Sequence, residues 1–125
     1  MVKSGATTIW EDWEGPTTDN GKGGGVASLN HYSKGTVCEW VFEVMCGIKV
    51  DGRNHFVIAP KPGGSFGYAW ADYDSVYGKV TCRWKKNADG YFEYDIVVPP
   101  NTTASLEING VEEKILNAGI YHFAV

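Results

Sequence analysis

The pattern of apolar and polar residues divides the chain into two unlike regions. Residues 1–34 show no sustained period and contain "GPTTDNGKGGGVAS", a composition typical of a loop. The following stretch, "SKGTVCEWVFEVMCGI", is apolar around most of a helical circumference. We therefore predict a helix that Ser33 caps at its start and that Gly47 ends in a left-handed conformation.

From about Asp51 the pattern changes to an alternation of apolar and polar residues, which predicts antiparallel strands with one buried face. Turn sequences separate several of these strands, namely "NADG", "PPNT" and "NG". The predicted strands cover 55–59, 67–74, 78–84, 91–98, 103–108 and 119–125. Short strands separated by frequent turns are typical of a β-sandwich, so we predict a mainly β fold with an antiparallel β-sandwich.

The predicted helix has more apolar surface than a small sheet can cover. A helix that is apolar on most of its circumference belongs in the core of a large domain. We therefore predict that residues 1–50 are the end of a larger helical domain, a loop plus one helix, and that residues 51–125 form a C-terminal β-sandwich domain.

Charge and length limit the kinds of partner that the chain can bind. The chain has 125 residues, a net charge of −4 and a pI of about 5.3. Nucleic acid and anionic membranes attract basic surfaces, so we expect neither as a partner. The one basic tract, 79–86, is interpreted as the exposed face of a strand. No apolar stretch is long enough to span a membrane, and any targeting signal would lie outside a fragment.

The three cysteines do not form a disulfide framework, because their number is odd and their spacing irregular. Cys38 and Cys46 would lie about 12 Å apart along a helix, which is too far for a disulfide. We interpret these two as small apolar core residues. Unpaired cysteines favour a reducing compartment such as the cytoplasm.

We expect neither a metal nor a cofactor. The histidines are scattered, and the cysteines lack the spacing of a zinc site. Asp72 and Asp74 could suggest calcium, but two acids on a strand and its turn are more often turn and edge residues. The glycines in "GKGGG" lack the Ser or Thr that follows the lysine of a phosphate-binding loop.

The stretch "GATTIWEDWEG" at 5–15 concentrates three carboxylates and two tryptophans in eleven residues. A buried core does not favour three carboxylates, and a solvated loop does not need two tryptophans. A site that binds or cleaves a sugar can use both, because aromatic rings pack on a sugar's apolar face while carboxylates act on its polar groups.

Four blocks follow one another along the chain: "GATTIWEDWEG", "SLNHYSKGTVCEWVFEVMCGI", "HFVIAPKPGGSFGYAWADYDSVYGKVTCRW" and "VPPNTTASLEING". In this order they resemble the end of bacterial α-L-rhamnosidases, which are glycoside hydrolases with a helical (α/α)6 barrel and a C-terminal β-sandwich. The resemblance covers nearly all of residues 4–125. It implies that the helix closes the barrel and that the full enzyme hydrolyses terminal α-L-rhamnose from glycosides or polysaccharides with inversion.

The resemblance also implies roles for individual residues. Glu11 matches the family's general base, and the general acid of that family lies upstream, outside this chain. Asp12 and Glu14 are poor substitutes for the acid, because they share a loop with Glu11 and would not reach the opposite face of the sugar. We therefore expect the isolated chain to be inactive.

Three further residues would bind substrate. Trp10 and Trp13 would provide aromatic walls for the apolar face and methyl group of a deoxy sugar. His31, in "NHY", resembles a family histidine that hydrogen-bonds the sugar. From the residues alone, each of these could instead be structural, and Glu11 could be a surface carboxylate.

Two other functions stay open. The chain could be a stand-alone carbohydrate-binding module, although its strand aromatics alternate as core residues do. It could also be an assembly domain, because the apolar helix needs cover, and we predict self-association through that helix.

Overall fold

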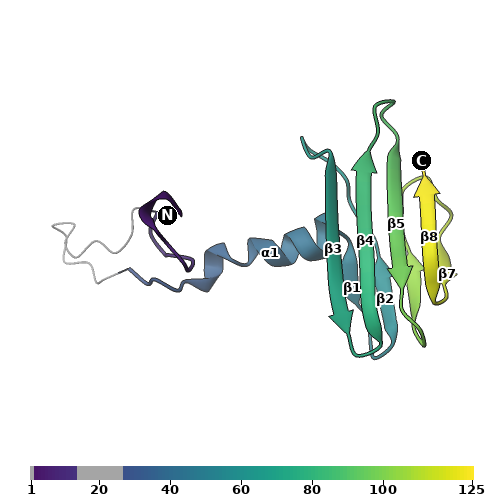
Figure 1. Ribbon diagram of the computed structural model, residues 1–125, viewed down its shortest axis with the longest axis horizontal. Helices are drawn as coiled ribbons and strands as arrows, with labels where there is room; N and C mark the ends of the chain where they lie inside the picture. The colour runs from purple at the N-terminus through teal and green to yellow at the C-terminus, as the bar shows by residue number, and fades with distance from the viewer. Residues whose placement is uncertain (1, 14–26) are drawn as a thin grey trace. The chain divides into compact units, whose positions relative to one another are not determined.

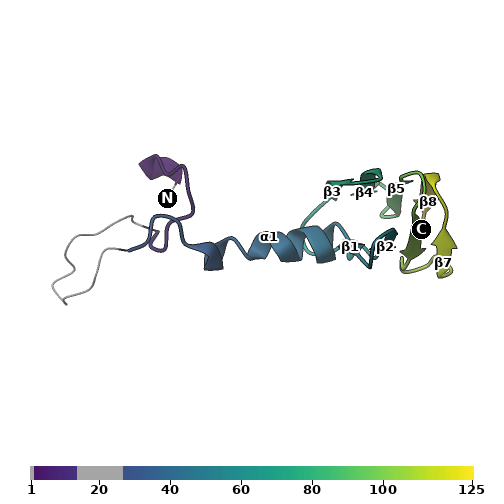
Figure 2. The ribbon, with the colours of Figure 1, turned by 90° about the horizontal axis from the view of Figure 1, so that it is seen from below.

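A computed structural model describes residues 2–13 and 27–125. It divides into two compact units, Met1–Cys38 and Glu39–Val125, which are considered separately below. The second unit holds the strands. Its two four-stranded sheets lie face to face as two layers, as Figures 1 and 2 show. The predicted mainly β sandwich with one preceding helix is confirmed.

The first sheet has the strand order β1-β2-β6-β7. Its strands are β1 (Ile48–Val50), β2 (His55–Ile58), β6 (Thr103–Leu106) and β7 (Lys114–Leu116). The sequence prediction missed β1 and β7. It was also wrong in making every pairing antiparallel, because β2 and β6 run parallel, with His55 opposite Thr103. Alternation reports which residues face the core but not the direction of the neighbouring strand.

The second sheet is antiparallel throughout, with the order β3-β4-β5-β8. Its strands are β3 (Tyr68–Ser75), β4 (Gly78–Lys86), β5 (Phe92–Val98) and β8 (Gly119–Ala124). Every one of them was predicted from alternation. The "NADG" turn is confirmed, because the Gly90 amide donates to the Asn87 carbonyl at 3.1 Å.

The core lies between the two sheets. The first sheet contributes Ile48, Phe56, Ile58, Ala104, Leu106 and Leu116, and the second contributes Ala69, Ala71, Val80, Cys82, Trp84, Tyr94, Ile96 and Val98. The inward faces of β4, β5 and β6 are the predicted ones. On β3 the prediction that strand aromatics are core residues was wrong: Ala69 and Ala71 are buried, whereas Tyr68 and Trp70 face solvent.

The helical segment is shorter and less regular than predicted. A 3-10 turn, η2 (Tyr32–Lys34), precedes α1 (Val37–Trp40) and a π-helical turn, η3 (Val41–Met45). Ser33 does not cap the helix. It lies inside η2, and its carbonyl accepts a hydrogen bond from the Thr36 hydroxyl at 2.7 Å. Gly47 does follow the helix in the left-handed region, at φ 79°.

The cysteine interpretation is half right. Cys46 and Cys82 are buried, but Cys38 is exposed on α1, so it is not a core residue. The exposed apolar side chains on α1 also include Val37 and Trp40, whereas Val41, Phe42 and Met45 of η3 pack against the sandwich core. Within the unit Glu39–Val125, the last helical turn is therefore covered by the sandwich.

Candidate functional site

Two segments that are distant in sequence pair with each other in the N-terminal unit. The His31 amide donates to the Ile9 carbonyl at 2.7 Å, and the Glu11 amide donates to the Ser28 carbonyl at 2.8 Å. These bonds form a short two-stranded arrangement between 9–11 and 28–31. It brings together the segments that carry two of the residues predicted to form the site, Glu11 and His31.

The Glu11 carboxylate is held in one orientation while it stays exposed. Its Oε2 accepts a hydrogen bond from the Ser28 amide at 2.8 Å. Its backbone carbonyl accepts a hydrogen bond from the Lys34 ammonium group. The segment that carries Glu11 is therefore fastened through both main chain and side chain, and the side chain remains accessible to water.

Lys34 also contacts the second tryptophan of the motif. Its Nζ lies 4.6 Å from the centroid of the Trp13 ring, which is the geometry of a cation–π interaction. The Trp13 side chain is 69% exposed, and Trp10 is half-buried. Trp13 therefore presents aromatic surface to solvent, as a sugar-binding wall requires.

His31 is half-buried, and its ring stacks on Tyr32 with centroids 5.8 Å apart and an interplanar angle of 22°. The stacking and the backbone bond to Ile9 fix the ring's position in the unit. The role of the His31 ring nitrogens rests on the family resemblance.

The sequence analysis missed Ser28 and Lys34, which both contact Glu11. No sequence pattern could have identified them, because each contact uses a backbone atom on one side. Glu14 and the glycine-rich loop interpreted above lie outside the described residues.

The acidic pair on β3 has protein partners. Asp72 accepts a hydrogen bond from the Thr81 hydroxyl at 2.8 Å and faces Arg83 at 3.5 Å. The hydrogen bond from Thr81, with the positive charges of Arg83 and Lys79, lowers the pKa of Asp72. Asp74 pairs with Lys79 at 3.2 Å. Both acids therefore pair with side chains of the neighbouring strand β4, in agreement with their interpretation as edge-strand residues.

Among residues 2–13 and 27–125, no group of three or more His, Cys, Asp or Glu side chains is arranged to hold a metal ion. None of the helices in this described part of the chain is long and apolar enough to cross a membrane.

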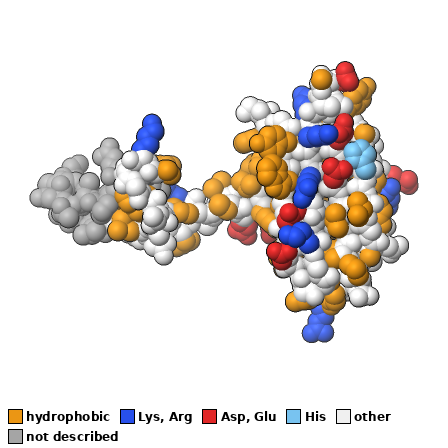
Figure 3. Space-filling model, in the orientation of Figure 1, with side chains coloured by type: hydrophobic (Ala, Val, Ile, Leu, Met, Phe, Trp, Pro, Cys, Tyr) orange, Lys and Arg blue, Asp and Glu red, His pale blue; other side chains and the backbone are white. Residues whose placement is uncertain are grey.

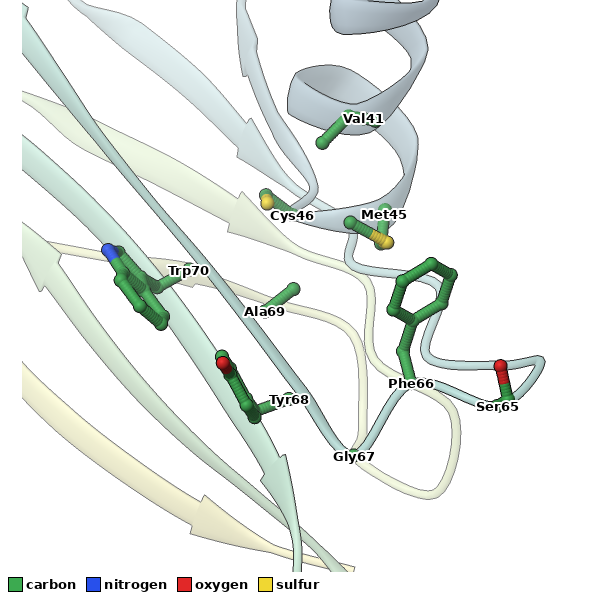
Figure 4. Close-up of a pocket in the computed structure, with 9 residues that line it drawn as sticks. All are labelled: Val41, Met45, Cys46, Ser65, Phe66, Gly67, Tyr68, Ala69 and Trp70. Atoms are coloured by element: carbon green, nitrogen blue, oxygen red, sulfur yellow. The ribbon is translucent and has the colours of Figure 1, made fainter. Parts of the chain in front are cut away.

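The C-terminal unit has a groove of its own, with a volume of about 510 Å³. One side is formed by η3 and the residue after it, through Val41, Met45 and Cys46. The other side is formed by residues 65–70, which lead into and begin β3. In Figure 4, Phe66 lies beside Met45, and Tyr68 and Trp70 extend from the opposite side of β3 to Ala69.

Two family descriptions match consecutive parts of this chain. Residues 1–45 match the bacterial alpha-L-rhamnosidase 6 hairpin glycosidase domain, and residues 49–122 match the bacterial alpha-L-rhamnosidase C-terminal domain. Together with the fold, these matches define the class: glycosidase-domain sequence followed by a C-terminal domain that folds as a β-sandwich. The chain belongs to the bacterial α-L-rhamnosidase family.

Curated relatives agree with this assignment. The chain is 38% identical over 110 residues to an alpha-L-rhamnosidase of Streptomyces avermitilis and, over the same number of residues, to one of Formosa agariphila. Both matches cover 86% of this chain. They cover only 11% and 12% of the relatives, so the chain spans about a ninth of their length.

Solved structures give the same result. The alpha-L-rhamnosidase of Aspergillus terreus matches with a TM-score of 0.79 and 28% identity, over 99% of this chain and 15% of that one. The Streptomyces avermitilis enzyme, whose structure was determined in complex with L-rhamnose, matches with a TM-score of 0.75 and 30% identity over 99% of this chain and 14% of its own. The chain thus corresponds to the C-terminal region of α-L-rhamnosidases.

Proposed function

We propose that this chain is the C-terminal part of an enzyme that hydrolyses terminal α-L-rhamnose in glycosides, and that Glu11 is its general base. In an inverting hydrolysis, Glu11 takes a proton from a water whose oxygen attacks the anomeric carbon. The bond to the leaving oxygen breaks as an acid elsewhere in the enzyme protonates that oxygen. The released rhamnose has the opposite anomeric configuration.

The observation that carries this proposal is the hydrogen bond from the Ser28 amide to Oε2 of Glu11, at 2.8 Å. A general base must hold one orientation towards its water, and this bond restrains the carboxylate while the side chain stays exposed. The bond engages Oε2, so we assign the proton-accepting role to Oε1.

Trp10, Trp13 and His31 would bind the sugar. The exposed ring of Trp13 offers a face for the apolar side of a deoxy sugar, and Lys34 restrains that ring. The segment of His31 pairs with that of Glu11, so a sugar bound near the carboxylate can lie within reach of the imidazole.

The isolated chain should be inactive, because an inverting enzyme needs two carboxyl groups about 6.5–9.5 Å apart on opposite sides of the sugar. Asp12 follows Glu11 directly on the same segment and does not meet that requirement. The test is hydrolysis of an aryl α-L-rhamnoside by the purified chain, with Glu11→Gln beside it. If the purified chain hydrolyses the rhamnoside and Glu11→Gln abolishes that activity, the chain itself supplies a general acid. The expectation that the acid is missing from this chain would then be wrong.

A chimera tests the base itself. The matching region of the Streptomyces avermitilis relative is replaced by residues 4–125 of this chain, and aryl rhamnoside turnover is measured. We expect Glu11→Gln to lower kcat by about 10²–10⁴-fold, and Asp12→Asn, the matched control, to leave most of the activity. Azide should restore turnover in Glu11→Ala by replacing the water. An active Glu11→Gln chimera would refute the assignment.

Self-association through the apolar helix is a second proposal, based on Trp40 of α1, which is exposed in the unit Glu39–Val125. A second copy of the chain could cover this apolar surface. Sedimentation velocity at rising concentration should give a dimer that Trp40→Gln dissociates. A wild-type monomer at all micromolar concentrations would exclude it.

A further inference from the structure

The outer face of β3 carries two aromatic side chains that the core does not use. Tyr68 and Trp70 stack on each other with centroids 5.5 Å apart and an interplanar angle of 16°. Their side chains are nevertheless 62% and 60% exposed. Their neighbours Ala69 and Ala71 supply the buried face of the strand. The two rings therefore pack against each other and still expose aromatic surface to solvent.

Polar side chains continue this surface across the sheet. Register places Lys85 opposite Tyr68 and Arg83 opposite Trp70, and it places Glu93 and Asp95 next in the same rows. Lys85 pairs with Glu93 at 2.8 Å, and Asp95 pairs with His122 at 2.9 Å. Figure 3 shows the apolar patch beside basic and acidic groups on this face.

The chemistry of this face indicates which ligand fits. A pyranose ring has an apolar face of C–H groups that stacks on an aromatic ring, and its rim of hydroxyls donates to carboxylates and accepts from Lys and Arg. Charges of both signs alternate along the rows, so the face does not favour a polyanion or an anionic membrane. A protein partner would have to desolvate the ion pairs beside the aromatic rings.

We propose that the outer face of the β3-β4-β5-β8 sheet binds a neutral saccharide, with Tyr68 and Trp70 as its stacking platform. The site lies wholly within the unit Glu39–Val125 and uses neither Glu11 nor His31. It therefore goes beyond the proposed hydrolytic role and gives the chain a place to hold a glycan without cleaving it.

The experiment is a titration of the ¹⁵N-labelled full chain, followed by NMR, with L-rhamnose, rutinose and neutral hexasaccharides of glucose, xylose and mannose. We expect saturable shift changes on β3 and its neighbours β4 and β5, separate from any shifts that L-rhamnose causes around Glu11 and His31. Trp70→Thr and Tyr68→Thr should each weaken binding at least about ten-fold, because threonine keeps the strand preference and removes the ring.

A matched control separates this site from the rest of the chain. Ile120→Thr alters a residue that is 83% exposed on β8 of the same sheet, and it should leave binding unchanged.

Three results would overturn the proposal. The first is the absence of any saturable shift in the sandwich with all of these sugars. The second is binding only around Glu11 and His31 that survives Trp70→Thr, a result that would leave the hydrolytic proposal intact. The third is concentration-dependent association that Trp70→Thr abolishes, which would make the face a contact between two copies.

Discussion

Replacing Trp84 by phenylalanine should destabilise the sandwich far more than the same change at Trp70. Both tryptophans lie in the second sheet, but Trp84 is 2% exposed and Trp70 is 60% exposed. The indole Nε1 of Trp84 donates to the Met45 carbonyl at 2.8 Å, and its ring meets Phe92 edge-on at 5.9 Å. Phenylalanine keeps an aromatic ring at the site and removes the donor.

The expected cost has two parts. Leaving the Met45 carbonyl without its donor costs about 1–3 kcal/mol, the usual penalty for a buried group that loses its partner. The smaller phenyl ring gives up about 40 Å² of buried apolar surface, which is about 1 kcal/mol. Together, Trp84→Phe should lower the free energy of unfolding by about 2–4 kcal/mol. Trp70→Phe should change it by less than about 0.5 kcal/mol.

The assay is urea unfolding monitored by far-UV circular dichroism. Tryptophan fluorescence is unsuitable because each variant lacks one of the fluorescent tryptophans. The midpoint should fall in Trp84→Phe, with an unchanged slope, and should hardly move in Trp70→Phe. A loss below about 1 kcal/mol in Trp84→Phe, or equal losses in the two variants, would refute the reasoning. The part-buried hydrogen bond from Trp84 to Met45 would then not stabilise the junction.

The remaining predictions concern Gly47 and the thiols. A Cβ at Gly47 would lie 2.1 Å from the Pro60 nitrogen at a φ of 79°, so Gly47→Ala should lower the thermal midpoint by ten degrees or more, about 3 kcal/mol, in calorimetry. In the native chain at pH 8, Cys38 alone should react rapidly with a disulfide reagent, because it is exposed while Cys46 and Cys82 are buried; three fast thiols in a mass spectrum would contradict this. Burial raises the pKa of the Cys82 thiol from 9.0 to about 12. The neutral thiol therefore contributes its full stabilisation below pH 9, and this contribution is lost as the pH rises towards 12, by up to about 1.4 kcal/mol per pH unit. Urea unfolding across this range should show a smaller loss in Cys82→Ala, and equal losses would contradict the reasoning.

Alternation predicted the strands of the second sheet well, because most of their outward positions are polar. In β5, Tyr94, Ile96 and Val98 face the core as expected. The exception is β3, where both faces of the strand carry apolar residues. The larger ones, Tyr68 and Trp70, are outside, and two alanines are inside. The size and apolarity of the side chains alone could not show which face of β3 points towards the core.

Other differences have tertiary causes. β1 (Ile48–Val50) and β7 (Lys114–Leu116) have three residues each, too few for a period to be recognised. Each is a strand because it pairs with a neighbour from elsewhere in the chain, β1 with β2 and β7 with β6. The parallel pairing of β2 and β6 likewise depends on how the chain returns to the first sheet, which no local pattern encodes.

The N-terminal site could be predicted only in part. The motif with Glu11 and the tryptophans was visible because its composition is unusual and resembles a family. Its partners were not, because Ser28 contacts Glu11 through a backbone amide, and Lys34 through a backbone carbonyl. Any residue type supplies such an amide, so sequence alone carries no signal for it.

The junction after the helix belongs structurally to the sandwich, although the sequence up to residue 45 matches the helical glycosidase domain. The last carbonyls of a helix have no partner within it and must find one elsewhere. Here the Val44 carbonyl accepts from the Lys61 amide at 3.0 Å, and the Met45 carbonyl accepts from Trp84. The Gly47 carbonyl accepts from the amide of Ala59 at 2.8 Å. A flexible linker would leave these groups to water. The sandwich instead holds the end of the helix by specific hydrogen bonds, so residues 44–47 are a fixed structural element of the unit Glu39–Val125.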